Sequence, residues 1–281
     1  NPKAAQKRHE QGWVDELHEA LDELIPRIRQ AVKAKEVVSM AYVGNVVDLW
    51  ERLAAEEIPV DLGSDQTSLH NPWAGGYYPV GLSYEASNKM MAEEPGRFRE
   101  CVQESLRRQV DAINKLTDRG MYFFDYGNSF LKAVYDSGVK SICKNGENDL
   151  DGFIFPSYVE DILGPCLFDF GYGPFRWCCL SRNPEDLDKT DAAAAAYILE
   201  NNRRYQDYDN YVWVRDAKRN RMVVGTQCRI LYQDAMGRMN IALKFNEMVR
   251  NGEIGPVMLG RDHHDTGGTD SPFRETSNIK D

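Results

Sequence analysis

The spacing of apolar positions predicts a chain of helices and short buried strands. In the first half, apolar residues recur every three or four positions over Trp13–Leu24 and over residues 85–118, where Pro95-Gly96 breaks the run. This period predicts amphipathic helices. Continuous apolar runs instead predict buried strands. These runs are Val37–Val43, Val60–Leu62 and Met121–Phe124.

A turn at Gly44-Asn45 joins the first of these strands to a helix expected over residues 46–56, which leads into the second strand. Strand, glycine turn, helix and strand form a βαβ unit, and such a unit implies a parallel sheet. The glycine lets a ligand approach the backbone at the start of the helix. The turn lacks the G-x-G-x-x-G pattern, so it does not specify a nucleotide by itself.

The second half predicts a further unit of helices and strands after Gly164-Pro165, which we expect to mark a domain boundary. The expected elements are a helix starting at Asn183-Pro184, a strand over Val223–Tyr232, a turn at Ala235–Arg238, a helix over Ile241–Val249 and a buried strand at Pro256–Leu259. We predict an α/β fold in which residues 1–163 form a parallel-sheet domain and residues 164–281 form part of a second αβ domain.

Composition narrows the class of protein. The chain has 281 residues, a net charge of −10 and a pI near 5.1, which argues against general binding to nucleic acid or acidic membranes. No apolar run approaches the roughly 20 residues that a membrane span requires, and no secretory signal is visible. Six cysteines without a C-x-x-C pair indicate reduced thiols in a cytoplasmic protein. Because the chain begins at Asn1 and stops directly after a motif-rich loop, we expect a piece of a longer protein.

The loop that follows the last predicted strand is the densest group of titratable side chains. Residues 260–276 contain two arginines, three aspartates and two histidines. Aspartate and histidine suit proton transfer, and arginine suits a carboxylate. A metal site at Asp262-His263-His264-Asp265 and a solvated loop are the alternatives. Adjacent histidines in extended chain point to opposite faces, which disfavours one shared ion.

Polar segments also follow the predicted strands of the first half. Residues 64–79 are rich in hydroxyl, amide and aromatic groups, and Asp125-Tyr126-Gly127-Asn128 follows the strand at Met121–Phe124. Bound ligands in parallel sheets lie at such strand ends. Arg176 lies within an aromatic run, where a guanidinium requires an anion. That anion is either a substrate carboxylate or a structural ion-pair partner.

Six motifs together resemble the urocanase family over nearly the whole chain. They are Asp65-Gln66-Thr67-Ser68 with His70, Gly76-Tyr77 with Pro79, Phe124-Asp125-Tyr126-Gly127-Asn128, Gly173-Pro174-Phe175-Arg176-Trp177, Phe245-Asn246 and the run from Gly260 to Asn278. The resemblance implies a cytoplasmic, homodimeric urocanate hydratase with a Rossmann-like domain. It also implies tightly bound NAD⁺ that acts as an electrophile in adding water to urocanate, giving 4-imidazolone-5-propanoate in histidine degradation.

The resemblance also implies residue roles. Asp262 and His263 would move protons, Arg274 would support the site, and Arg176 would bind the urocanate carboxylate. The implied NAD⁺ residues are Asn45, Val46, Gln66, Thr67, Ser68, Leu69, His70, Tyr77, Tyr78 and Tyr126. No residue is assigned to a metal.

Two departures from the family pattern leave alternatives open. Leu231 stands where one branch of the family has a cysteine, so no cysteine is assigned a role. The family's N-terminal portion, with the first part of the NAD⁺ fold, and a downstream Gly-rich segment fall outside this chain. A metal-dependent hydrolase built on Asp262–Asp265 and a non-catalytic NAD⁺-binding fragment remain the competing hypotheses.

Overall fold

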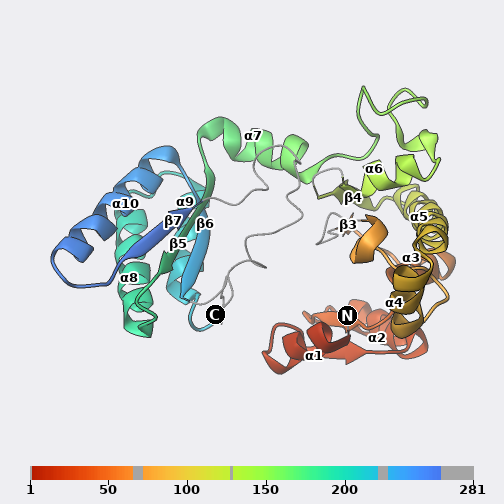
Figure 1. Cartoon of the computed structure of the whole chain (residues 1–281), viewed down its shortest axis with the longest axis horizontal. Coiled ribbons are helices and arrows are strands. Elements are labelled where there is room, and N and C mark those ends of the chain that lie inside the picture. The colour runs from red at the N-terminus through yellow and green to blue at the C-terminus, as the bar shows by residue number, and fades with distance from the viewer. Residues whose placement is uncertain (1, 66–71, 127–128, 221–226, 261–281) are drawn as a thin grey trace. The chain divides into compact units, whose positions relative to one another are not determined.

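The computed structural model describes residues 2–65, 72–126, 129–220 and 227–260 (Figure 1). The chain divides into two compact units, Asn1–Ser157 and Tyr158–Asp281, and each has its own buried core. The boundary expected from the sequence, after residue 163, lies close to this division. Among the described residues, no helix is both long and apolar enough to cross a membrane.

Unit 1 is a mixture of helices and short parallel strands. Its helices are α1 (Pro2–Glu10), α2 (Leu21–Ala34), α3 (Val46–Ala55), α4 (Tyr84–Glu93), α5 (Pro95–Thr117) and α6 (Ser129–Asp136). Its strands are β1 (Glu16–His18), β2 (Met40–Tyr42), β3 (Leu62–Asp65) and β4 (Tyr122–Asp125). Short turns of other helical types occur at η1 (Pro72–Gly76) and η2 (Lys140–Ile142).

Helix α5 forms the centre of the unit 1 core. Apolar residues at three- and four-residue spacing bury one face, including Phe98, Val102 and Leu106, which are at most 1% exposed. This face packs against α3 and β4. Pro95 begins α5, where a missing N–H costs nothing, and ends the preceding α4. The predicted helical region with a break at Pro95-Gly96 is confirmed.

The strands of unit 1 pair in parallel, as predicted, but not all with the expected neighbours. Strand β3 pairs with β4 from Leu62↔Tyr122 to Asp65↔Asp125, and β1 pairs with β2. The sequence predicted that β2 and β3 would belong to one βαβ unit. In the described part of the chain they lie in separate two-stranded sheets. The parallel crossover instead runs from β3 through α4 and α5 to β4.

Two predictions near the N-terminus are wrong. Trp13–Leu24 is not one helix, because Glu16–His18 forms β1 and α2 begins only at Leu21. Pairing with β2 supplies backbone hydrogen bonds that outweigh the helical spacing. The strand expected over Val37–Val43 is reduced to Met40–Tyr42, and Val37 is fully exposed.

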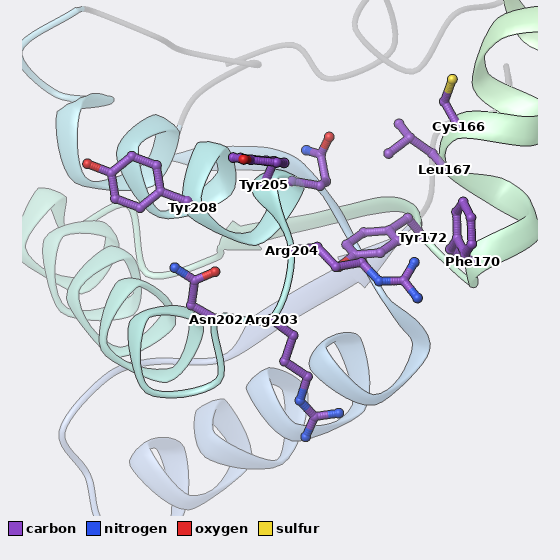
Figure 2. A pocket seen from close by; sticks show the side chains of 10 residues that line it. Cys166, Leu167, Phe170, Tyr172, Asn202, Arg203, Arg204, Tyr205 and Tyr208 are labelled. Carbon is purple, nitrogen blue, oxygen red and sulfur yellow. The ribbon is translucent and has the colours of Figure 1, made fainter.

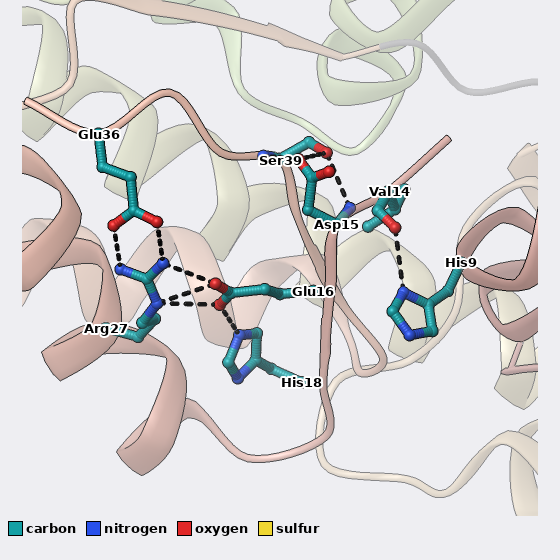
Figure 3. Close-up of polar contacts among 8 residues, drawn as sticks. All are labelled: His9, Val14, Asp15, Glu16, His18, Arg27, Glu36 and Ser39. Carbon is teal, nitrogen blue, oxygen red and sulfur yellow. Dashed lines mark hydrogen bonds and ion pairs between the residues drawn. The ribbon is translucent and has the colours of Figure 1, made fainter. Parts of the chain in front are cut away.

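Polar and charged side chains fix the start of β1 (Figure 3). Arg27 of α2 donates to the carboxylates of both Glu16 and Glu36, at 2.6 and 2.7 Å for its closest contacts. Asp15 accepts hydrogen bonds from the backbone N–H and the hydroxyl of Ser39 at 2.8 and 2.7 Å. These long-range contacts hold Asp15 and Glu16 beside Ser39 and Arg27, where β1 begins.

Unit 2 is built on a three-stranded antiparallel sheet. Its strands are β5 (Gly173–Cys179), β6 (Cys228–Gln233) and β7 (Val257–Gly260), in the order β6-β5-β7. Its helices are α7 (Gly164–Cys166), α8 (Pro184–Glu200), α9 (Tyr205–Asp216) and α10 (Ala235–Arg250), with short turns η3 (Tyr158–Leu163) and η4 (Phe168–Phe170). Figure 1 shows α8 and α10 against one face of this sheet.

Strand β5 is buried along its whole length. Phe175 and Trp177 belong to the core formed with α8 and α10. Because side chains alternate along a strand, Arg176 lies on the opposite face of the sheet. The strand predicted at Pro256–Leu259 is observed as β7, but the prediction that it is buried is wrong. Strand β7 is an antiparallel edge strand, and Met258 is 51% exposed.

Helix α10 begins earlier than predicted. Ala235–Arg238 was expected to be a turn, but it forms the first turn of α10, because the Asp234 carboxylate accepts a hydrogen bond from the backbone N–H of Gly237 at 2.6 Å. The helix start predicted at Asn183-Pro184 is confirmed, with Asn183 as N-cap. The strand predicted over Val223–Tyr232 is observed as β6 from Cys228, and residues 223–226 lie outside the described residues.

The expectation that the cysteines are all reduced thiols is wrong for two of them. Cys178 and Cys228 form a disulfide, while Cys101, Cys143, Cys166 and Cys179 are free. The two bonded residues lie directly opposite each other in the antiparallel β5–β6 pair. The neighbouring Cys179–Gln227 pair carries the backbone hydrogen bond, so Cys178 and Cys228 occupy the closely spaced, non-hydrogen-bonded position. Sequence spacing could not reveal this pairing.

The disulfide makes a direct prediction about thiol counts. When the chain is denatured without reductant and alkylated with iodoacetamide, four cysteines should be modified, and six should be modified after reduction. Intact mass spectrometry gives both numbers, and peptide mapping should show the unmodified pair as Cys178 and Cys228. Six modified cysteines without reductant would contradict the cross-link.

A buried ion pair should also contribute strongly to the stability of unit 2. Arg229 of β6 binds Asp191 of α8 at 2.9 Å, and both side chains are buried. Asp191→Ala should lower the free energy of unfolding by about 3–5 kcal/mol, because the charge of Arg229 would stay buried without the Asp191 carboxylate. Urea unfolding should be measured at about pH 8, since burial raises the pKa of Asp191 to about 7.

The matched control is Asp188→Ala on the same helix. Asp188 pairs with Lys218 at 2.6 Å on the exposed surface, so its loss should cost only about 0–1 kcal/mol. Equal losses of unfolding free energy in the two variants would show that the buried ion pair contributes no more to stability than the exposed one.

Candidate functional site

Unit 1 contains a pocket of about 480 Å³ next to the C-terminal end of β3. It lies between the N-terminus of α3, the segment around Tyr77 and the helices α4 and α5. Four residues predicted to bind a cofactor line it, namely Asn45, Val46, Tyr77 and Tyr78. The pocket also has polar walls, formed by Asp65, Ser83, Glu85, Ser87, Ser105 and Gln109.

Asn45 fixes the entrance of the pocket through both ends of its amide group. Its side-chain oxygen accepts a hydrogen bond from the N–H of Val47 at 3.0 Å and so caps α3. Its Nδ2 donates to the carbonyl of Tyr78 at 2.9 Å. The amide therefore joins the start of α3 to the opposite wall. The N-terminus of α3 faces the pocket, and helix N-termini favour anionic groups.

Tyr77 is held by Asp65 at the floor of the pocket. The Tyr77 hydroxyl donates to Asp65 Oδ1 at 3.0 Å, and Gln109 of α5 donates to Asp65 Oδ2, also at 3.0 Å. Asp65 is 8% exposed and ends β3. These contacts place a carboxylate, a phenol and an amide on one wall of the pocket.

Tyr78 and Tyr84 add an aromatic surface to the lining of the pocket. Their ring centres are 5.4 Å apart, and the Tyr78 hydroxyl donates to Asn88 of α4 at 2.9 Å. Val46 exposes 41% of its surface beside them. A flat ring could pack against such a wall, and polar groups could bind at the N-terminus of α3.

Tyr126, also predicted to bind the cofactor, is not a lining residue of this pocket, but it lies at the adjacent strand end. Its N–H donates to the carbonyl of Asp65 at 3.2 Å, across the ends of β3 and β4. The preceding residue, Asp125, is 1% exposed. Burial raises the pKa of Asp125 to about 7, although its hydrogen bond from Leu131 N–H opposes that shift, and the nearby charge of Asp65 adds to it.

The remaining predicted cofactor residues, Gln66, Thr67, Ser68, Leu69 and His70, lie outside the described residues. The same holds for Asp262, His263 and Arg274. Their predicted roles stay predictions. The chain positions of the two segments are still informative, because one directly follows Asp65 and the other follows the last residue of β7.

Arg176 is buried in the central strand of unit 2, with 4% of its surface exposed. Its register partners are Ile230 on β6 and Gly260 on β7. Asp262 is only two residues beyond Gly260 in the chain. The sheet therefore starts the predicted proton-transfer loop directly beside Arg176. This proximity comes from antiparallel pairing, whereas the sequence suggested a loop at the end of a parallel strand.

Unit 2 has a wider, open hollow of about 800 Å³ (Figure 2). Arg204 lies 4.3 Å from the centre of the Phe170 ring, and Tyr172 donates to Asp207 at 2.7 Å. Burial and this carboxylate raise the pKa of Tyr172. Arg176 is not among its lining residues. The hollow is therefore distinct from the predicted carboxylate site.

Sequence reasoning did not single out several polar residues of the unit 1 pocket. Ser105 and Gln109 occupy apolar-face positions of α5, four residues apart, and are at most 2% exposed. Ser105 accepts from the N–H of Val80 at 2.9 Å. The sequence marks Ser105 and Gln109 only as polar residues within the apolar stripe of a helix. Asp65 and Asp125 were signalled by their place at strand ends.

Metal binding has no support among the described residues, which contain no group of three or more His, Cys, Asp and Glu side chains arranged around a common point. The alternative cluster, Asp262, His263, His264 and Asp265, lies outside the part of the chain that the structure describes.

Comparison with known proteins gives a consistent result over both units. The Urocanase Rossmann-like domain matches residues 1–162, and the Urocanase C-terminal domain matches residues 166–281. A Rossmann-like domain fits a nucleotide cofactor. The chain is 50% identical to urocanate hydratase of Homo sapiens over 99% of its length and 49% identical to that of Mus musculus over 98%. It is also 49% identical to a probable urocanate hydratase of Caenorhabditis elegans over 98% of its length.

The chain spans about two fifths of these relatives, covering 43% of the human protein and 42% of the other two. The match nevertheless extends through almost all of this chain and includes two consecutive domains in order. The α/β fold predicted from the sequence is thereby confirmed. On these grounds, the chain belongs to the urocanase family.

Proposed function

We propose that this chain supplies part of a urocanate hydratase, which adds water to urocanate and gives 4-imidazolone-5-propanoate in histidine degradation. The observation that carries the proposal is the unit 1 pocket, whose walls include Asn45, Val46, Tyr77 and Tyr78. The family resemblance implies a role in binding NAD⁺ for all four. Residues 33 positions apart in the chain thus line one pocket, joined by the Asn45–Tyr78 hydrogen bond.

The cofactor proposed for this pocket is NAD⁺. A volume of about 480 Å³ falls within the range typical of small-molecule and cofactor sites. The N-terminus of α3 suits a phosphate group, and Tyr78 with Tyr84 suits a flat ring. When bound, NAD⁺ supplies an electron-poor pyridinium, which is an electron sink that no side chain offers.

The protein's own contribution in unit 1 is to hold the cofactor. Asn45 fixes the start of α3, and Val46 offers an apolar contact beside it. Asp65 orients Tyr77 by accepting a hydrogen bond from its hydroxyl group. Gln66, Thr67, Ser68, Leu69 and His70 follow Asp65 directly and are proposed to complete the binding site with Tyr126.

In unit 2, Arg176 is proposed to bind the urocanate carboxylate. Its guanidinium presents paired donors that match the two oxygens of a carboxylate, and its burial strengthens a charge-assisted contact. Asp262 and His263 are proposed to move protons to and from the substrate, and Arg274 to support them. The Arg176–Gly260 register supports this grouping, because it brings the start of that loop beside the arginine.

A cytoplasmic location and a homodimeric assembly are part of the proposal through the family resemblance. The acidic composition agrees with a protein that acts on a small molecule and binds neither nucleic acid nor membrane. No observation on the described residues favours the metal-dependent hydrolase. A non-catalytic NAD⁺-binding fragment differs from the proposal only in turnover, so kinetics on the complete protein discriminate the two.

The proposed function predicts a bound cofactor and a measurable reaction. Denaturing the purified complete protein should release NAD⁺ in a ratio near one per chain, identified by mass spectrometry. Mixing the native protein with urocanate should abolish the ultraviolet absorbance of its conjugated side chain. NAD⁺ without a change in absorbance would favour the non-catalytic alternative, and absence of NAD⁺ would contradict the cofactor assignment.

A further prediction concerns the carboxylate site. Arg176→Ala in the complete protein should lower kcat/KM for urocanate by at least about 30-fold, because truncating one partner of a buried charge pair costs about 2 kcal/mol or more. NAD⁺ content should not change. Arg176→Lys should recover only part of the loss, since a lysine keeps the charge without the paired donors. Unchanged kinetics in Arg176→Ala would exclude the role.

A further inference from the structure

Two buried aspartates face each other where the parallel strands of unit 1 end. Asp65 is the last residue of β3, Asp125 is the last residue of β4, and the two are partners in the strand register. They are 8% and 1% exposed. Like charges directly opposite in a sheet repel, and burial removes the water that would screen them.

The two carboxyl groups have different surroundings. Asp65 accepts hydrogen bonds from Tyr77 and Gln109, both of which are neutral donors. Asp125 Oδ2 accepts from the N–H of Leu131 in the first turn of α6, at 3.0 Å. Within the described part of the chain, Asp125 Oδ1 is buried without a hydrogen-bond partner. Both carboxylate oxygens of Asp65 therefore accept a hydrogen bond from a side chain, whereas, among the described residues, Asp125 receives backbone N–H groups and keeps one oxygen buried without a geometric hydrogen bond.

Few other ionisable groups face Asp125. The residues of α6 that pack near it, Phe130 and Leu131, are apolar, and the neighbouring Pro156-Ser157 segment carries no charge. Tyr77 and Gln109 reach Asp65 from the pocket side. In the described residues, Asp65 is the charged group that acts on Asp125.

Both strand ends hold residues proposed to bind the cofactor. The Asp65 side chain fixes Tyr77, and the Asp65 carbonyl accepts from the N–H of Tyr126. Any separation of Asp65 from Asp125 would therefore move both tyrosines together. We propose that Asp125 is a positioning residue: its carboxyl proton keeps the ends of β3 and β4 together, and its ionisation weakens cofactor binding by displacing Tyr77 and Tyr126. This inference rests on the proposed NAD⁺ site.

The direction of the pH dependence follows from the buried carboxyl. Burial raises the pKa of Asp125 to about 7, with Asp65 adding to the shift. Asp125 carries its proton below that pH and loses it above. Cofactor affinity should therefore be highest in mild acid and should fall as the pH rises through about 7. Well above the pKa of Asp125, the affinity for NAD⁺ should fall by about tenfold for each further pH unit.

The test measures the dissociation constant of NAD⁺ for cofactor-depleted complete protein by equilibrium dialysis, from about pH 5.5 to 8.5. Wild type should lose affinity across the range. Asp125→Asn should bind with the acid-side affinity at every pH, because the amide oxygen still accepts from Leu131 and no charge can form. A dependence due to a histidine would persist in this variant.

Asp118→Asn is the matched control, since Asp118 is exposed at the end of α5 in the same unit. It should reproduce the wild-type profile. The proposal is overturned if the wild-type profile is flat, if Asp125→Asn retains the wild-type dependence, or if Asp125→Asn binds NAD⁺ weakly at every pH.

A second measurement separates this inference from the proposed function. The urea midpoint of wild type, compared with that of Asp125→Asn, should fall as the pH rises from about 4 to 7. Between these pH values, Asp125 keeps its proton in the folded chain, whereas the same residue is ionised in the unfolded chain. Raising the pH therefore favours the unfolded state and lowers the stability of the folded one. If NAD⁺ fails to bind at any pH, the proposed function fails. The urea midpoints at different pH values still decide whether Asp125 holds its proton. If the difference in midpoint between wild type and Asp125→Asn does not change with pH, the inference is overturned.

Discussion

The parallel register of β3 and β4 is the constraint on which the candidate cofactor site depends. Each strand is only four residues long, so its position depends on what packs around it rather than on its own pairing. The buried face of α5 supplies that packing, and Gln109 on the same helix binds Asp65 at the strand end. One helix therefore supports the sheet and also orients the polar floor of the pocket.

In unit 2, antiparallel strands fix the position of a candidate site residue. Strand β5 is covered on both edges by β6 and β7, and Trp177 anchors it to α8 through a hydrogen bond to Thr190 at 3.1 Å. Arg176 is placed by this strand rather than by a loop. A charged side chain on a rigid, buried strand loses little freedom when it binds an anion, which agrees with the role proposed for Arg176.

Sequence patterns predicted those elements whose local preference and tertiary packing agree. The helices at 46–55 and 95–117 combine an apolar stripe with a clear start signal, and both were found. Prediction failed at Glu16–His18, where the helical spacing competes with pairing to β2, and at Val37, which has no core to enter. The antiparallel order of unit 2 was also missed, because strand direction depends on contacts distant in sequence.

Some features of the candidate site could likewise be predicted from the sequence, and others could not. Asn45 and Tyr78 could be named in advance, because the family motifs mark them, yet their mutual hydrogen bond could not. Ser105 and Gln109 interrupt an apolar stripe, and that irregularity is visible in the sequence. The opposition of Asp65 and Asp125 depends on the strand register alone, which no local pattern encodes.

The cross-link between Cys178 and Cys228 has a topological consequence. The bonded residues are separated by 50 positions, so α8, α9 and the segment after them form a closed ring. In the chain-entropy description, a ring of this size restricts the denatured ensemble enough to favour the native one by about 4 kcal/mol. About two fifths of unit 2 is thus tethered at the strand that carries Arg176, and the persistence of that tether depends on the thiol–disulfide balance of the compartment.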